Sequence, residues 1–279
     1  MDTSRMIVQS DWLAQHLSDR NLVILHIGVD RSSYHAGHIP GARFLALSDI
    51  VVTRNGVPNQ LPPVDNLKAT FERLGVGDRS RVVIYSDMLG LLAARAYFTL
   101  DYLGKANNAA LLDGGLEAWT KEHETVRSVP AEPGPTVLTI HPCPEVVVEL
   151  GRMRQIVPNR SAILIDARSP MDYSGVGRSE GIARPGHIPG AVNVFWVDTL
   201  VTQQNPVFKP VSEIRARYAA AGVKPGAKVI VYCWGGIQPA HDYFTLKLAG
   251  FRSSLDAGSF VEWSSTFGTA IETGLGGRQ

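Results

Sequence analysis

The sequence contains little cysteine and no large excess of charge of either sign. Its 279 residues include two cysteines, Cys143 and Cys233, which cannot build a disulfide framework. The formal net charge is +1, so the composition gives no argument for binding nucleic acid or an anionic membrane. No apolar run is long enough to span a bilayer, and residues 1–10 lack the apolar core of a signal peptide. These absences predict a globular protein of the reducing cytoplasm, with no nucleic acid and no membrane as partner.

What the sequence does contain is a long internal repeat. The six residues Gly-His-Ile-Pro-Gly-Ala occur at 37–42 and again at 186–191. Each copy follows an apolar stretch and precedes a second apolar stretch, a segment with Tyr-Phe-Thr-Leu, and an acidic turn before a tryptophan. A repeat of this kind predicts two homologous domains, and the chain length suits two domains of about 130 to 140 residues.

The pattern within each half predicts an α/β fold. The apolar stretches are short and rich in β-branched residues, as buried parallel strands are. The strands expected from this pattern are 22–27, 81–86, 163–167 and 228–233. The amphipathic stretches expected to form helices between them are 11–17, 66–74, 92–103, 211–221 and 238–248. This alternation predicts, in each domain, a parallel sheet flanked by helices on both faces.

A segment dense in proline and glycine marks the boundary between the two halves. Residues 130–135 read Pro-Ala-Glu-Pro-Gly-Pro, which excludes a regular element. We therefore expect an N-terminal domain over residues 1–129, a linker over 130–144, and a C-terminal domain over 145–279.

Cys233 stands at the carboxyl end of an expected strand, where ligands bind in open α/β sheets. We expect the backbone N–H groups of the loop that follows, together with the start of the next helix, to favour a thiolate and so a nucleophile. The residues of this loop are Trp234, Gly235, Gly236, Ile237 and Gln238. The alternative is a buried, inert cysteine. In the first half the equivalent position is Ser86, so that domain is predicted to lack the nucleophile.

Several motifs together resemble one enzyme family. The spacing Cys-x-x-Gly-x-x-x-x-His, formed by Cys233, Gly236 and His241, resembles the active-site segment of two-domain rhodanese-type sulfurtransferases. Both copies of the six-residue repeat, residues 165–169 and residues 193–196 resemble that family as well. The resemblance covers nearly the whole chain. It implies two tandem rhodanese-like domains, of which the first is catalytically inactive and the second catalytic.

The resemblance also implies a reaction. Cys233 would take a sulfane sulfur from thiosulfate or 3-mercaptopyruvate and hold it as a persulfide cradled by the loop N–H groups. It would then pass the sulfur to cyanide or to a thiol acceptor, such as thioredoxin or another thiol protein. No metal and no organic cofactor is implied. Asp166 matches the family's aspartate that braces the active-site loop, although an Asx turn at the end of a strand is an equal alternative.

The sequence departs from the family where the sulfur donor would be held. Directly after the cysteine, members that prefer thiosulfate usually carry Arg and Lys, or Arg alone, and members that prefer mercaptopyruvate carry Gly-Ser. This chain has Trp234 and Gly235 there. Asp172 stands where an arginine is common. We therefore expect Arg184, and secondarily Arg178, to bind the donor anion.

These arginines could also be solvated loop residues. Trp196 is expected to form an apolar wall of the pocket or, equally, part of the core.

Two other functions compete with this interpretation. A cysteine phosphatase would need an arginine six residues after the cysteine, where the chain has Pro239. A non-catalytic binding or sulfur-relay module would not need the intact cysteine loop. We expect His38, His187 and His241 to have structural roles.

Overall fold

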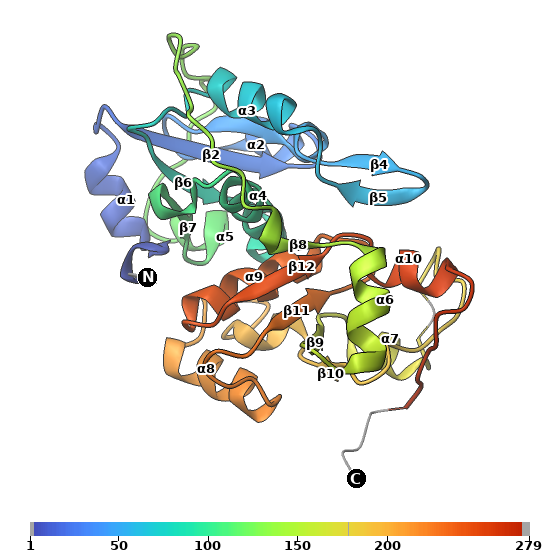
Figure 1. The fold of residues 1–279 in the computed structure, drawn as a ribbon. Helices are drawn as coiled ribbons and strands as arrows, with labels where there is room; N and C mark the ends of the chain where they lie inside the picture. The colour runs from blue at the N-terminus through green and yellow to red at the C-terminus, as the bar shows by residue number, and fades with distance from the viewer. Residues whose placement is uncertain (1–2, 178, 275–279) are drawn as a thin grey trace. The chain divides into compact units, whose positions relative to one another are not determined.

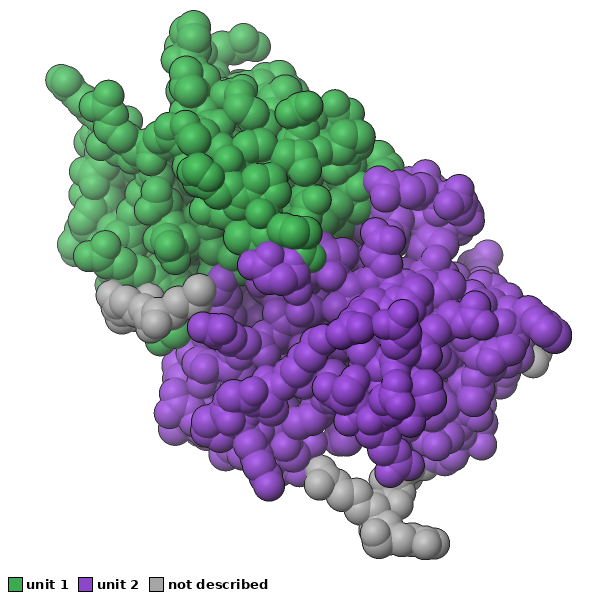
Figure 2. Space-filling view, viewed as in Figure 1, with its two compact units in different colours: residues 1–52, 61–144, 200–208 green, residues 53–60, 145–199, 209–279 purple. Residues whose placement is uncertain are grey.

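The computed structural model describes residues 3–177 and 179–274, in which short helices and strands alternate (Figure 1). The chain folds into two compact units (Figure 2). The first unit contains residues 1–52, 61–144 and 200–208. The second unit contains residues 53–60, 145–199 and 209–279. Each unit therefore includes a short segment from the other half of the chain.

The first unit is built on a five-stranded parallel sheet in the order β1-β7-β6-β2-β3. Its strands are β1 (Ile7–Val8), β2 (Leu22–Gly28), β3 (Arg43–Ala46), β6 (Arg81–Tyr85) and β7 (Ala109–Leu112). Its helices are α1 (Ser10–His16), α2 (Ser32–Ala36), α3 (Val64–Arg73), α4 (Leu91–Tyr102) and α5 (Gly115–Trp119). One face of the sheet packs against Leu13 of α1 and Trp119 of α5. Helix α4, buried along almost its whole length, packs against β2, β6 and β7.

The second unit repeats this topology with the strand order β10-β9-β11-β12-β8, again with parallel pairs throughout. Its strands are β8 (Val147–Val148), β9 (Ile163–Asp166), β10 (Val192–Asn193), β11 (Val229–Tyr232) and β12 (Ser253–Asp256). Its helices are α6 (Leu150–Asn159), α7 (Pro170–Ser174), α8 (Val211–Ala220), α9 (Gln238–Leu248) and α10 (Ser259–Ser265). Met153 of α6 and Trp263 of α10 pack on one face, and α9 packs against β11 and β12. The α/β architecture predicted from the repeat is confirmed.

One element that was not predicted from the sequence is a hairpin of β4 (Val52–Arg54) and β5 (Val57–Gln60), which forms a separate two-stranded sheet (Figure 1). Asn55 and Gly56 connect the strands with φ values of 52° and 78°. Positive φ at both residues is what a two-residue type I′ turn requires, and Asn-Gly is its preferred sequence. The signal for this hairpin was therefore present in the sequence.

Two segments at matching positions in the repeat each belong to the unit formed mainly by the other half of the chain: residues 53–60 to the second unit and residues 200–208 to the first. The hairpin follows the short 3-10 helix Leu47–Asp49, and residues 200–208 follow the 3-10 helix Trp196–Thr199. In the first unit, the N–H of Phe208 donates to Asp113 Oδ1 over 2.9 Å. In the second unit, Asn59 Nδ2 donates to the Gly235 carbonyl over 2.7 Å.

Residues 127–143, which include most of the expected linker, form no helix or strand. They are attached to the first unit by side chains, since Leu138 N–H donates to Glu72 and Thr139 Oγ1 donates to Asp78. Cys143 lies at the end of this segment, where its thiol donates to the His141 carbonyl over 3.5 Å. Over the part of the chain that the structure describes, no helix has the length and apolar character needed to cross a membrane.

Candidate active site

Cys233 follows β11 directly and is buried, with 1% of its surface exposed. Its backbone is held by the next strand and helix of the unit. The Cys233 N–H donates to Ser259 Oγ over 3.3 Å, and its carbonyl accepts from the Phe260 N–H over 2.9 Å. The cysteine is thus fixed between the end of β11 and the start of α10.

The loop after Cys233 turns its backbone toward the sulfur. The N–H groups of Gly235 and Gly236 each lie 3.2 Å from Cys233 Sγ. Gly236 has a φ of 91°, which a residue with a side chain rarely adopts. Ile237 leads into α9, and Gln238 is its first residue, with a side-chain oxygen that is buried without a hydrogen-bond partner among the described residues. The geometry is that of a cradle for a sulfur carrying negative charge.

Burial and the loop N–H groups act in opposite directions on the pKa of the Cys233 thiol. Burial raises the pKa of Cys233 to about 11, although the N–H groups of Gly236 and Gly235 act in the opposite direction. Burial therefore opposes the thiolate that the loop N–H groups favour. The free-energy cost of burying a thiolate away from water is larger than the stabilisation that the loop N–H groups provide.

Asp166 ends β9, beside the end of β11. Its carboxylate is held by Arg168, whose Nε donates to Oδ1 over 3.0 Å and whose Nη2 donates to Oδ2 over 2.5 Å. Both side chains are almost completely buried. Arg168 also donates from Nη2 to the carbonyl of Gly186, in the second copy of the six-residue repeat.

Arg168 is a site residue that the sequence analysis did not single out. Burial is the largest single influence and by itself would lower the pKa of Arg168. The charge and hydrogen bonds of Asp166, with smaller contributions from Tyr232 and Cys233, together raise that pKa above its ordinary value. The guanidinium also lies 4.1 Å from the centre of the Phe260 ring. The available signal was the Asp-Ala-Arg spacing at 166–168, because a cation two residues from a strand-end aspartate can reach its carboxylate.

Arg184 has a different setting from the one expected. Its guanidinium donates to the backbone carbonyls of residues 263, 264, 266 and 269 and to Thr269 Oγ1. These bonds use most of its five donors to fasten the segment after α10. The expectation that Arg184 captures the donor anion does not fit this geometry, and a structural clamp explains the residue better. Arg178 lies outside the described residues.

Trp196 and Asp172 also have clear structural partners. Trp196 is 7% exposed and meets the ring of His241 edge-on at 5.1 Å, which places it in the core. Asp172 accepts from the hydroxyls of Ser169 and Ser179 over 2.8 and 2.7 Å. The carboxylate of Asp172 therefore links Ser169, before α7, to Ser179, after it.

The two repeated histidines have matching structural roles, as expected. The rings of His38 and His187 stack on Tyr34 and Tyr173, each with a centroid distance of 3.8 Å. In each pair, Nδ1 of the histidine bonds the backbone oxygen of the same tyrosine. Burial lowers the pKa of His241 to about 3, so that ring is neutral inside the fold.

In the first unit, the position equivalent to Cys233 has little space for a ligand. Ser86 follows β6, and its hydroxyl accepts from the Ala93 N–H over 3.3 Å. The adjacent cavity has a volume of about 10 Å³, roughly the room that one water molecule needs. Pro206 and Phe208, from the segment contributed by the second half of the chain, form part of its wall.

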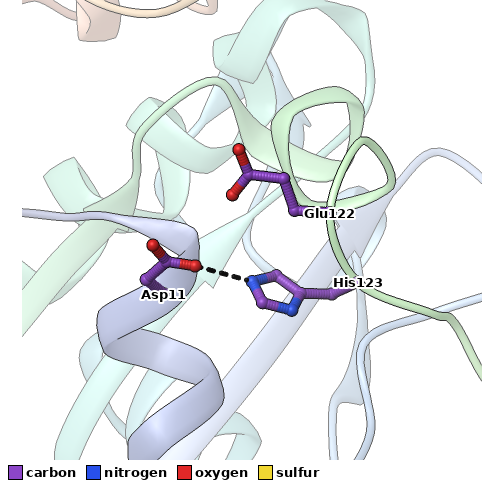
Figure 3. Close-up of side chains that lie close together, drawn as sticks. All are labelled: Asp11, Glu122 and His123. Carbon is purple, nitrogen blue, oxygen red and sulfur yellow. Dashed lines mark hydrogen bonds and ion pairs between the residues drawn. The ribbon is translucent and has the colours of Figure 1, made fainter.

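A group of ionisable side chains also occurs on the surface of the first unit. Asp11, Glu122 and His123 bring potential metal-ligand atoms within 4.8 Å of one another (Figure 3). His123 Nε2 lies 3.2 Å from Asp11 Oδ1, and both carboxylates are exposed to solvent. The histidine and the aspartate satisfy each other, and we assign no site to this group.

Both halves of the chain are similar to known proteins. The family model of the rhodanese-like domain matches residues 9–122 and residues 150–266. The chain is 30% identical to a thiosulfate sulfurtransferase of Corynebacterium glutamicum over 285 residues, covering 96% of this chain and 90% of that protein. It is also 30% identical to a probable 3-mercaptopyruvate sulfurtransferase of Pseudomonas aeruginosa over 286 residues, covering 98% of this chain and 99% of that protein.

A solved structure gives the same result at the level of the fold. SseA from Escherichia coli, described as a 3-mercaptopyruvate sulfotransferase with the rhodanese fold, superposes with a TM-score of 0.79 and 25% identity. The match covers 91% of this chain and 98% of SseA. The likeness extends over both units.

Proposed function

Because the chain belongs to the rhodanese-like family and is a sulfurtransferase, we propose that Cys233 is its sulfur carrier and that the donor is thiosulfate or 3-mercaptopyruvate. The observation that carries this proposal is the position of Cys233 Sγ, 3.2 Å from two loop N–H groups at the end of a buried strand. Ser86, the equivalent residue of the first unit, is a poor nucleophile beside a cavity of water size.

The proposed reaction is a double displacement. The Cys233 thiol loses its proton, and the thiolate attacks the outer sulfur of thiosulfate, releasing sulfite, or the sulfur of mercaptopyruvate, releasing pyruvate once a proton reaches the departing carbon. The product in each case is a Cys233 persulfide. The N–H groups of Gly235 and Gly236 stabilise the negative charge on the sulfur in a site with little water.

The second half of the reaction returns the enzyme to its starting state. An acceptor nucleophile attacks the outer persulfide sulfur, and the electron pair of the S–S bond returns to Cys233. Cyanide would leave as thiocyanate, and a thiol would leave as a persulfide. We propose a thiol acceptor such as thioredoxin or another thiol protein in the cell. The reducing cytoplasm is the compartment we propose, because it keeps Cys233 reduced between cycles.

The charge of the loop bears on the choice of donor. Residues 234–238 carry no charged side chain, and the nearby cation of Arg168 is paired with Asp166. Thiosulfate is a dianion, and 3-mercaptopyruvate is a monoanion near neutral pH. A neutral loop disfavours the dianion more, because each charge must leave water to reach the sulfur. We therefore propose 3-mercaptopyruvate as the better donor.

Steady-state rates with both donors and cyanide as acceptor test this proposal. We expect thiocyanate to form with each donor, with the higher kcat/KM for 3-mercaptopyruvate. Equal or higher kcat/KM for thiosulfate would overturn the donor preference alone. No thiocyanate and no persulfide with either donor would indicate a binding module and overturn the proposed function.

A further inference from the structure

The hairpin of β4 and β5 supplies side chains that bond the loop around Cys233. Residues 53–60 belong to the second unit although they come from the first half of the chain. Asn59 Nδ2 donates to the Gly235 carbonyl over 2.7 Å, and Gln60 Nε2 donates to the Ala257 carbonyl over 2.6 Å. A Cβ added to Gly235 would lie 3.3 Å from Cγ of Pro58, so the hairpin is in direct contact with the loop.

The bond from Asn59 acts on the peptide group that faces the sulfur. The Gly235 carbonyl and the Gly236 N–H belong to one planar trans peptide unit, so they point in opposite directions. Asn59 holds the oxygen end, and the N–H end lies 3.2 Å from Cys233 Sγ. A donor on the oxygen also polarises the peptide and strengthens the hydrogen bond that its N–H gives.

The backbone of Asn59 is shaped for this contact. Its φ is 55°, in the left-handed region that side chains other than Asn and Asp rarely occupy. Asn55, in the turn of the same hairpin, has nearly the same φ of 52°, but its side chain is exposed at the turn. The hairpin therefore contains two left-handed asparagines, of which Asn59 bonds the loop.

We infer that Asn59 is a positioning residue for the sulfur carrier, because it holds the Gly235–Gly236 peptide so that its N–H faces Cys233. The inactive half of the chain thereby contributes to the chemistry of the active half. The inference rests on the proposed role of Cys233. It goes further by assigning part of the sulfur cradle to a residue 176 positions before Gly235 in the sequence, a separation far beyond local contacts.

The experiment compares Asn59→Gly with Asn55→Gly, both in a Cys143→Ser background in which Cys233 is the remaining cysteine. Glycine accepts the left-handed backbone at both positions, so each variant loses one side chain without backbone strain. Two rates are measured below the pKa of the thiol: alkylation of Cys233 by iodoacetamide and single-turnover loading of sulfur from thiosulfate. We expect Asn59→Gly to slow both rates about tenfold, the loss typical of a misaligned hydrogen bond to an anion. Asn55→Gly should stay within about twofold of the parent.

Two results would overturn the inference. Unchanged rates in Asn59→Gly would show that the peptide is held without the amide. Equal slowing in Asn55→Gly would show that the rates depend on the rigidity of the hairpin and not on the hydrogen bond from Asn59 to the Gly235 carbonyl. If Asn59→Gly does not fold, Asn59→Asp keeps the shape and replaces the donor with a group that repels the carbonyl, so it should slow alkylation at least as much.

The alkylation rate also separates this inference from the proposed function. It reports the thiolate of Cys233 and does not depend on sulfur transfer. A parent protein that is alkylated but takes up no sulfur would refute the proposed function, and the comparison of the two asparagines would still test the role of Asn59.

Discussion

Arg168 binds both carboxylate oxygens of Asp166, and the two side chains are only 3% and 0% exposed. A pair removed from water in this way gains little over an apolar pair, but breaking it leaves a buried charge without compensation. The pair lies at the end of β9, beside the strand that leads into Cys233, and the charge of Asp166 adds to the burial that raises the pKa of the thiol.

We predict that Asp166→Asn lowers the free energy of unfolding by about 3–5 kcal/mol, because it leaves the Arg168 charge buried and unpaired. Urea unfolding measures this loss. The control is Asp198→Asn, since Asp198 pairs with Arg217 at a site where both are about 40% exposed. The control should cost less than about 1 kcal/mol. Similar losses in the two variants would contradict the account of the buried pair.

The raised pKa of Cys233 predicts a pH-dependent first half-reaction. With a thiol pKa of about 11, the thiolate fraction rises with pH throughout the neutral and mildly alkaline range. The rate of sulfur loading from thiosulfate should therefore increase about tenfold per pH unit between about pH 7 and 10. Thiosulfate suits the measurement because its charge is constant over this range. A loading rate that is already level at neutral pH would show that Cys233 is a thiolate in the free enzyme.

Arg184 is predicted to act on stability and not on donor binding. Because its guanidinium fastens the segment after α10 from a partly exposed position, Arg184→Ala should cost about 1–2 kcal/mol of unfolding free energy. The KM for either donor should change little. Arg184→Lys keeps the charge but cannot bond all these acceptors, so it should be nearly as unstable as the alanine variant. A large rise of KM in Arg184→Ala that Arg184→Lys restores would favour anion capture.

Asp256 predicts a fall of stability as the pH rises. Burial, and then repulsion from Glu262, raise its pKa in the folded protein to about 8. Between the ordinary aspartate pKa and about pH 8, the folded protein keeps a proton that the unfolded chain has released, so stability decreases as the pH increases. The contribution is at most about 1.4 kcal/mol per pH unit. Asp256→Asn should flatten the curve of unfolding free energy over this range, and parallel curves for the two proteins would refute the assignment.

Much of the fold could be predicted from the sequence because its signals are local and occur twice. The strand before Cys233 and helix α9 were located within a residue or two, since the apolar run and the amphipathic run have clear ends. The repeat then linked the two halves and predicted matching sheets. The Asn-Gly turn was an equally local signal, and its hairpin was missed because β4 and β5 have no apolar periodicity.

The rest of the site depends on contacts between distant residues. No local pattern shows that Asn59 bonds the Gly235 carbonyl, or that Arg184 bonds the segment after α10. For the protonation of Cys233, sequence spacing reveals the loop dipoles but not the depth of burial that opposes them.

The most direct test of the account is the intact mass of the protein after incubation with thiosulfate or 3-mercaptopyruvate. The parent protein and Cys143→Ser should each gain about 32 Da, the mass of one sulfur atom held as a persulfide, and cyanide should remove it. Cys233→Ser should gain nothing. A Cys233→Ser protein that still gains the sulfur, or a Cys143→Ser protein that does not, would contradict the assignment of Cys233 as the sulfur carrier.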